Sequence, residues 1–162
     1  MVEDVTRSLG YLTLGTRCRR LGERLQAQTQ RILDAFEVPI QAAQYPFLAA
    51  IDRLGPVTIG DLAEAVGVTQ PAATRAVAGL VEQALVEVAA ASDDQRRRLV
   101  TLSAPARRLV ERGQRTVWPV IEGAVKEACR GLAGPLLEQL TGLEGRLDEV
   151  PLDERATRAR RR

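Results

Sequence analysis

Apolar residues recur at intervals of three and four over most of this chain, the spacing that gathers them on one face of an α-helix. Four long stretches show this pattern: residues 9–36, 42–54, 103–130 and 135–150. Pro39 interrupts the chain between the first two, and Pro135 begins the last, because proline disfavours a helix interior. Pro119 is expected to bend the third stretch after Trp118. The pattern predicts a mainly α protein.

Two shorter helices are predicted between the second and third stretches, within residues 58–83. Thr58 is predicted to cap the first of them, with Asp61 three positions later completing the cap. Gly67 suits the left-handed conformation that ends a helix, and Thr69 is predicted to cap the next one. Two helices joined by three residues form a helix-turn-helix, a unit that reads DNA in some proteins and is an ordinary helical hairpin in others.

The second of these helices has an apolar side and a polar side. Its inward stripe comprises Ala73, Val77 and Leu80. Its outward edge comprises Gln70, Pro71, Thr74 and Arg75, with Thr69 just before them. Short polar side chains with one long donor can enter a major groove about 12 Å wide, where Gln can bind adenine and Arg can bind guanine. A solvated helix face more typically carries Glu and Lys, so this edge favours DNA recognition.

Apolar and polar residues alternate, as in β-strands, over residues 86–90 and 98–102. The connection between them starts with a turn-forming Ser-Asp-Asp and ends with three arginines: Arg96, Arg97 and Arg98. These guanidinium groups are expected to reach phosphates or a narrow minor groove, with Asp94 orienting Arg96. A charge run is usually a solvated loop, but a hairpin that follows a helix-turn-helix indicates a wing.

Leucines in the last stretch repeat at alternating intervals of four and three, as in the contact seam of a coiled coil. Such a seam on a small protein needs a partner helix, either the apolar stripe of residues 9–36 in the same chain or a second copy. We expect the second arrangement, with the N- and C-terminal helices interleaving across a two-fold axis. The expected dimer contacts are Leu14, Leu21, Leu136, Leu140, Leu143 and Leu147.

Composition restricts the chemistry of the chain. It has no histidine and only two cysteines, which excludes histidine-based catalytic triads and ordinary structural zinc sites. We find no convergent acid–base set and no glycine-rich phosphate loop, and therefore expect neither an enzyme nor a bound metal or cofactor. The first residues lack a signal-peptide pattern, and no apolar run approaches the ~20 residues of a membrane span. A reduced, cytoplasmic location is expected.

Charge gives no general argument for nucleic-acid binding. The net charge is +2, but without residues 151–162 the chain has 18 basic and 19 acidic residues, so any DNA-facing field must be local. The sequence therefore predicts four segments. They are an N-terminal dimerisation helix and linker (1–40), a winged helix-turn-helix lobe (41–103), C-terminal dimerisation helices (104–150) and a disordered basic tail (151–162).

The segments LAEAVGVTQPAATRAVAGLVEQALVE and DDQRRRLVTLS, together with the flanking helices, resemble the MarR family of bacterial transcriptional regulators. The similarity covers roughly residues 8–150. It implies a homodimer of winged helix-turn-helix lobes on a palindromic operator, with residues 70–83 as the recognition helix and Asp94 and Arg96 as the wing pair. It also implies a small ligand, often phenolic or anionic, bound between the lobe and the dimer helices.

Three positions depart from the family pattern. Ala84 stands where glycine is typical, so the recognition helix is expected to end by a different route than a left-handed glycine. Residues 88–91 lack the basic residue that often follows, which removes an expected phosphate contact. Gln41 replaces the Thr or Ser that commonly caps the second helix.

The leading prediction is thus a sequence-specific, ligand-responsive regulator, expected to be a repressor. One alternative is a thiol-based redox sensor, because Cys18 lies among Arg17, Arg19 and Arg20, whose charge favours the thiolate. Against it, Cys18 shares the apolar stripe of the first helix, and a buried cysteine usually behaves as a small hydrophobe. A second alternative is a winged helix that binds protein partners without binding DNA.

Overall fold

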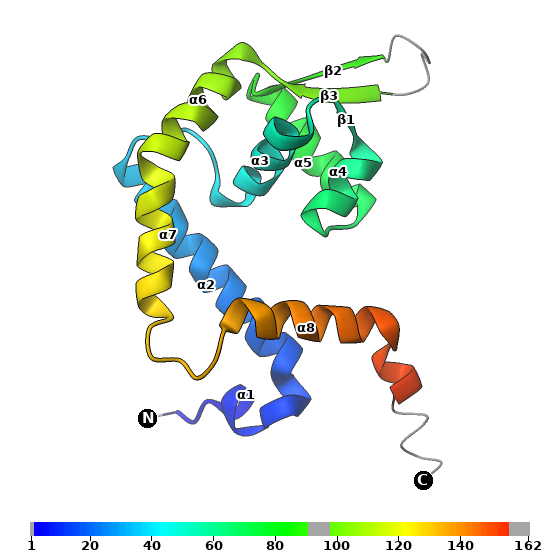
Figure 1. The fold of residues 1–162 in the computed structure, drawn as a ribbon. Coiled ribbons are helices and arrows are strands. Elements are labelled where there is room, and N and C mark those ends of the chain that lie inside the picture. Colours follow the sequence, from blue (N-terminus) through cyan, green and yellow to red (C-terminus); the bar gives the residue numbers. More distant parts are fainter. Residues whose placement is uncertain (1, 91–97, 156–162) are drawn as a thin grey trace. The chain divides into compact units, whose positions relative to one another are not determined.

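The computed structural model describes residues 2–90 and 98–155, and Figure 1 shows the order of its elements. Asp94, Arg96 and Arg97 therefore lie outside the described residues, as does the end of the basic tail. The helices and strands, in chain order, are α1 (Val5–Ser8), the 3-10 helix η1 (Gly10–Thr13), α2 (Leu14–Ala35), the 3-10 helix η2 (Ala42–Gln44), α3 (Tyr45–Leu54), β1 (Val57–Thr58), α4 (Ile59–Val66), α5 (Gln70–Glu82), β2 (Val86–Ala90), β3 (Arg98–Leu102), α6 (Ala104–Arg115), α7 (Val117–Ala128) and α8 (Leu136–Glu149).

The chain forms two compact units, one ending at Ile121 and the other beginning at Glu122. The first unit contains the predicted winged helix-turn-helix, which confirms the mainly α fold. Each α-helix and strand from α2 to α7 contributes at least one buried side chain to the hydrophobic core. The largest fully buried side chains are Leu33, Leu48, Ile51, Leu62, Leu80, Val100, Val110 and Val117. No helix among the described residues is long and apolar enough to cross a membrane.

The β-sheet has three antiparallel strands in the order β1-β3-β2, not the two that the sequence predicted. β2 and β3 occupy the predicted residues, with Val88 opposite Val100. The additional strand is β1, whose Val57 pairs with the other edge of β3 at Val100. The wing is thereby tied to the start of α4, because Thr58 is the last residue of β1 and also the N-cap of α4.

The hydrogen bonds around Gln41, at the entry into α3, differ from those that a Ser or Thr cap would make. The Gln44 side chain accepts a bond of 2.9 Å from the Gln41 backbone N–H. Gln30, on α2, accepts 2.7 Å from the Ala42 N–H and donates 3.2 Å to the Ile40 carbonyl. Backbone groups at a helix start need such partners, so these two glutamines join the end of α2 to the entry into α3.

Helix α5 ends through a left-handed residue, as the family pattern has it, although that residue is alanine. Ala84 has a φ of 55°, and the Leu85 N–H donates to the Leu80 carbonyl at 2.9 Å, the bond of a Schellman cap. The expectation of a different ending was wrong. The Ala84 carbonyl accepts a bond of 2.8 Å from the buried Ser103 hydroxyl, so the end of α5 is fastened to the start of α6.

Ala84→Gly is expected to raise the free energy of unfolding by about 0.5–1 kcal/mol, measured by urea denaturation. Glycine removes the Cβ clash of the left-handed conformation, and its larger backbone entropy in the unfolded chain offsets only part of that gain. The matched control is Ala78→Gly inside α5, which should lower the free energy by roughly 1 kcal/mol. A decrease of similar size in both variants would show that Ala84 is not strained.

The helix after the sheet is broken into α6 and α7 at Thr116, rather than bent after Trp118 as predicted. Thr116 has φ −122° and ψ −80°, and its hydroxyl donates 2.8 Å to the Arg112 carbonyl. Pro119 explains the position of the break, because a proline ring clashes with the carbonyl four residues earlier, here that of Arg115. The chain departs from helix immediately after that residue.

Trp118 packs into this break. Its ring centroid lies 4.2 Å from that of Tyr45, and a Cβ placed on the buried Gly113 would overlap the indole. The indole Nε1 is buried without a hydrogen-bond partner among the described residues. Burial raises the pKa of the Tyr45 hydroxyl, and the charge of Asp52 raises it further.

The predicted dimer residues on α2 and α8 carry little burial within the single chain. Leu21 is 54% exposed, and Leu33 is the only buried residue of α2. In the second unit, α8 has no buried residue, and Leu140, Leu143 and Leu147 remain 42%, 40% and 37% exposed. Both helices thus present apolar side chains to solvent, as helices with an unfilled seam do.

Candidate nucleic-acid interface

The outward edge of α5 lies where the sequence predicted it. Ala73, Val77 and Leu80 are buried, which confirms the inward stripe. The predicted edge is exposed at each of its residues: Thr69, Gln70, Pro71, Thr74 and Arg75. Neither Gln70 nor Arg75 has an ion pair or side-chain hydrogen bond within the described part of the chain. Their long side chains are therefore available to an external partner.

The helix-turn-helix holds α5 through the turn from Gly67 to Thr69. Gly67 takes the left-handed conformation, φ 73° and ψ 37°, and the Val68 N–H donates 2.9 Å to the Ala63 carbonyl. At the start of α4, the Thr58 hydroxyl accepts 3.2 Å from the Asp61 N–H and donates 2.7 Å to the Asp61 carboxylate. The predicted α4 cap is thereby confirmed.

The cap predicted for α5 is only half correct. Thr69 occupies the N-cap position, but its side chain makes no capping hydrogen bond. The first-turn N–H groups of α5 therefore remain unsatisfied by that side chain, at the end of the helix where the dipole is positive. A phosphate oxygen is a suitable partner for such groups.

The Thr74 hydroxyl has less hydrogen-bonding capacity for an external partner than the sequence predicted. Its hydroxyl donates 2.9 Å to the Gln70 carbonyl one turn earlier, a common arrangement for threonine in helices. The oxygen can still accept a bond, and the methyl group remains on the exposed edge. Thr74 is therefore better suited to an amino group or a thymine methyl than to a base acceptor.

Two further residues extend the edge and were missed in the sequence. Ala78 follows Thr74 by four residues, and Val81 follows Ala78 by three; both are exposed, Val81 by 45%. Continuing the same i,i+4 progression would have found Ala78. An alanine methyl can contact the thymine methyl in the major groove, so the edge combines polar and apolar contact groups.

Of the predicted wing tip, only Arg98 is described. It is exposed, opens β3, and pairs in register with Ala90 of β2. The pairing of β1 with β3 begins one residue later, at Leu99, so Arg98 is held in the sheet from the β2 side. The roles expected for Asp94, Arg96 and Arg97 lie outside the described residues and stay predictions.

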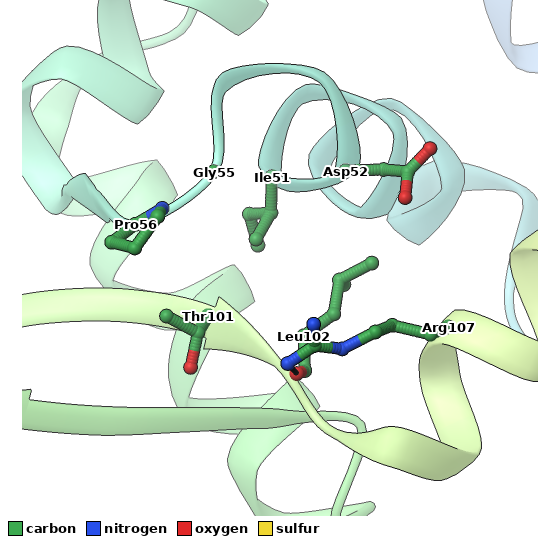
Figure 2. A pocket seen from close by; sticks show the side chains of 7 residues that line it. All are labelled: Ile51, Asp52, Gly55, Pro56, Thr101, Leu102 and Arg107. Atoms are coloured by element: carbon green, nitrogen blue, oxygen red, sulfur yellow. Dashed lines mark hydrogen bonds between the residues drawn. The ribbon is translucent and has the colours of Figure 1, made fainter.

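A cavity of about 140 Å³ lies behind the sheet, between the end of α3 and the start of α6 (Figure 2). Ile51 and Pro56 face Thr101 and Leu102 across it. Arg107 borders the cavity, and its guanidinium donates 3.1 Å to the Leu102 carbonyl. Small-molecule pockets usually measure about 300–1,000 Å³, so this cavity suits water or a very small anion.

Cys18 is exposed on α2, contrary to the reading that buries it as a small hydrophobe. Cys129, the other cysteine, is half-buried just after α7. The exposed thiol is accessible to reagents and to oxidants.

A sequence model of the MarR family matches residues 38–98. This range contains α3, the helix-turn-helix, β2 and the first residue of β3. The likeness to the MarR family thus covers most of the winged helix-turn-helix lobe. No match is found among curated proteins.

Solved structures extend the likeness from the lobe to its flanking helices. A mutant of E. coli MarR complexed with operator DNA has a TM-score of 0.67 at 22% identity, over 92% of this chain and 99% of that one. The M. tuberculosis regulator MosR in complex with DNA has a TM-score of 0.70 at 21% identity, over 86% and 98%. Bordetella bronchiseptica BpsR, whose DNA binding is regulated by 6-hydroxynicotinic acid, has 0.66 at 24%, over 85% and 94%. These likenesses show a shared fold.

Proposed function

We propose that this protein is a sequence-specific DNA-binding transcriptional regulator, acting in the cytoplasm as a repressor. The observation that carries the proposal is the exposed edge of α5, where Gln70 and Arg75 have no partner within the described residues, on a MarR-family lobe. Arg can bind guanine through two bonds, and Gln can do the same with adenine. The structures of MarR with operator DNA and of MosR with DNA support this use of the fold.

The regulator acts as a homodimer on a palindromic site. Most leucines of the two stripes remain exposed in the single chain, as in helices that a second copy covers: Leu21 and Leu25 on α2, and Leu140, Leu143 and Leu147 on α8. A two-fold dimer presents two copies of α5, so the half-sites are expected about one helical turn, or a multiple of it, apart. In this proposal, residues 1–40 and 104–150 form the dimer, and residues 41–103 bind DNA.

A small molecule relieves DNA binding. BpsR, which shares the fold, is regulated by 6-hydroxynicotinic acid. The cavity beside the Arg107 guanidinium is a candidate site for a small acid, because Arg107 is positively charged. Its volume of about 140 Å³ admits only part of such a molecule unless α3 or α6 moves. The effector of this protein is therefore expected to be an anion that widens this region.

Selection of bound sequences from a random DNA library tests the proposal directly. The expected result is an inverted repeat whose half-sites share one rotational setting on the duplex. Binding should weaken steeply as salt increases, because phosphate contacts release counterions. Failure to enrich any sequence, or binding that is insensitive to salt, would instead support the alternative that the winged helix contacts only proteins.

A redox function is the second candidate, and the exposure of Cys18 favours it. In that case peroxide abolishes operator binding by the wild type but not by Cys18→Ser, since sulfenic acid forms on an accessible thiolate. Equal peroxide responses of the two proteins would eliminate this candidate while leaving the DNA-binding proposal intact.

A further inference from the structure

A pocket of about 440 Å³ opens where α1 folds back against the first half of α2. Figure 1 shows the two helices at the N-terminal end of the chain. Four arginines line the pocket, together with Cys18 and the apolar Leu14 and Leu21. The volume falls within the usual range of small-molecule sites, about 300–1,000 Å³. The pocket lies away from α5 in sequence and plays no part in the proposed DNA interface.

One of the four arginines already binds an anion, which belongs to the chain itself. Arg20 Nη1 and Nη2 donate to the two oxygens of Asp4 at 3.1 and 2.9 Å. The Arg7 backbone N–H adds a bond of 3.1 Å to the same carboxylate. These bonds, led by the one from the Arg20 side chain, lower the pKa of Asp4 below its ordinary value. The pocket therefore has the geometry to hold an oxyanion through two parallel bonds.

The remaining arginines are not compensated. Arg7, Arg17 and Arg24 have no acidic side chain within ion-pair distance in the described part of the chain, while Arg20 is paired with Asp4. By contrast, Arg19, next to the pocket on α2, is paired with Glu23 at 3.4 Å. The pocket thus gathers more positive charge than its own acidic group neutralises.

We propose that this pocket binds a phosphate group, either free or on a small organic molecule, which takes the place of Asp4 on Arg20. A phosphate dianion suits several guanidinium groups, because its oxygens can accept bonds from more than one fork at once. A single carboxylate, as Asp4 shows, satisfies one arginine. Leu14 and Leu21 form an apolar wall in the single chain, so an organic phosphate gains contacts that free phosphate lacks. Because we also expect these two leucines at the dimer contact, ligand in the pocket competes with the second copy for them.

Displacement of Asp4 has a structural consequence. The bonds from Arg20 connect α1 to α2 across sixteen residues of sequence, and a second link is the Thr13 hydroxyl, which donates 2.5 Å to the Thr6 carbonyl. A phosphate on Arg20 removes the first link. The N-terminal segment is then held to α2 less firmly, and ligand and Asp4 compete for one site.

Protection of the Cys18 thiol provides a local test. In a Cys129→Ser background, Cys18 is the single thiol, and its alkylation by neutral N-ethylmaleimide is followed with increasing inorganic phosphate or phenyl phosphate at constant ionic strength. We expect saturable slowing by both probes. Stronger protection by phenyl phosphate identifies the organic form as the preferred source, and equal protection identifies free phosphate.

Variants decide whether the pocket is responsible. Arg24→Gln should weaken apparent phosphate affinity by roughly tenfold, since a charge-assisted bond is lost. Asp4→Asn should tighten it several-fold, by about the affinity that competition costs. Arg19→Gln is the matched control, with the same change in charge outside the pocket, and should leave affinity unchanged.

Three results would overturn the proposal. The first is no protection beyond that given by chloride at equal ionic strength. The second is an equal effect of Arg19→Gln and Arg24→Gln, which would reduce the response to general electrostatics. The third is a loss of self-association in Arg24→Gln without any phosphate response. That result would indicate that these arginines form ion pairs with acidic residues of a second copy. Asp4, Arg19 and Arg24 are exposed and Cys129 is half-buried, and circular dichroism checks that the variants fold.

Discussion

Replacing Gly113 by alanine is expected to lower the free energy of unfolding of the winged lobe by about 2–3 kcal/mol, measured by urea denaturation. The added Cβ would overlap the Trp118 indole, and the indole also packs against the Tyr45 ring, with the ring centroids 4.2 Å apart. Forcing an extra carbon into a filled site typically costs about 1–3 kcal/mol. The rigid indole places this case at the upper end.

The same substitution elsewhere separates this clash from the ordinary effect of glycine in helices. Gly79 lies inside α5 with no atom near its missing Cβ, so Gly79→Ala should stabilise the protein by roughly 1 kcal/mol. Trp118→Ala, combined with Gly113→Ala, should cost less than the sum of the two single changes. Additive costs in that double variant would show that the indole is not what excludes a side chain at position 113.

Arg75→Ala is expected to weaken binding to the selected operator about 30-fold or more. One bidentate arginine contact to guanine contributes roughly 1–3 kcal/mol, and a dimer loses two of them. Because the contact reads a base, the selected sequence should also become degenerate at one position in each half-site. Fluorescence anisotropy with labelled operator measures the first effect, and repeated selection measures the second.

Arg115→Ala controls for the lost positive charge. Arg115 is exposed on α6 and is paired with Glu111 at 3.6 Å, so its removal should change affinity little. Arg98→Ala should behave differently from both, since a wing contact to phosphate weakens all sequences alike and reduces the salt dependence. If Arg75→Ala lost affinity equally for every sequence, Arg75 would contact phosphate rather than a base.

Local signals in the sequence predicted the parts of the fold that depend on local interactions. Strict alternation placed both wing strands at the residues where they occur, and the Thr58–Asp61 pair placed the start of α4. Gly67 predicted the left-handed turn before α5 because few other residues favour that conformation. The outward edge of α5 followed from helical periodicity, although its role in binding DNA remains a prediction.

The features that were missed depend on tertiary contacts. β1 has two residues, too few for alternation to be visible, and it exists because β3 offers a free edge. Ala84 takes a left-handed conformation that its type disfavours, because Ser103 and the Leu85–Leu80 bond hold the chain there. The helix break is a local effect instead: the Pro119 ring clashes with the Arg115 carbonyl, so α6 ends at Arg115 and not after Trp118.

Trp118 gives the protein an optical reporter at the junction of α6 and α7. It is the only tryptophan in the chain, so emission excited at the red edge of the indole band arises from one place. Its nitrogen is shielded from solvent and its ring touches Tyr45, which should make the emission blue-shifted and sensitive to the separation of α3 from α7. An effector that increases the separation of α3 from α7 should shift this emission to longer wavelength before the proposed dimer dissociates. The shift can be followed in unlabelled protein and without DNA.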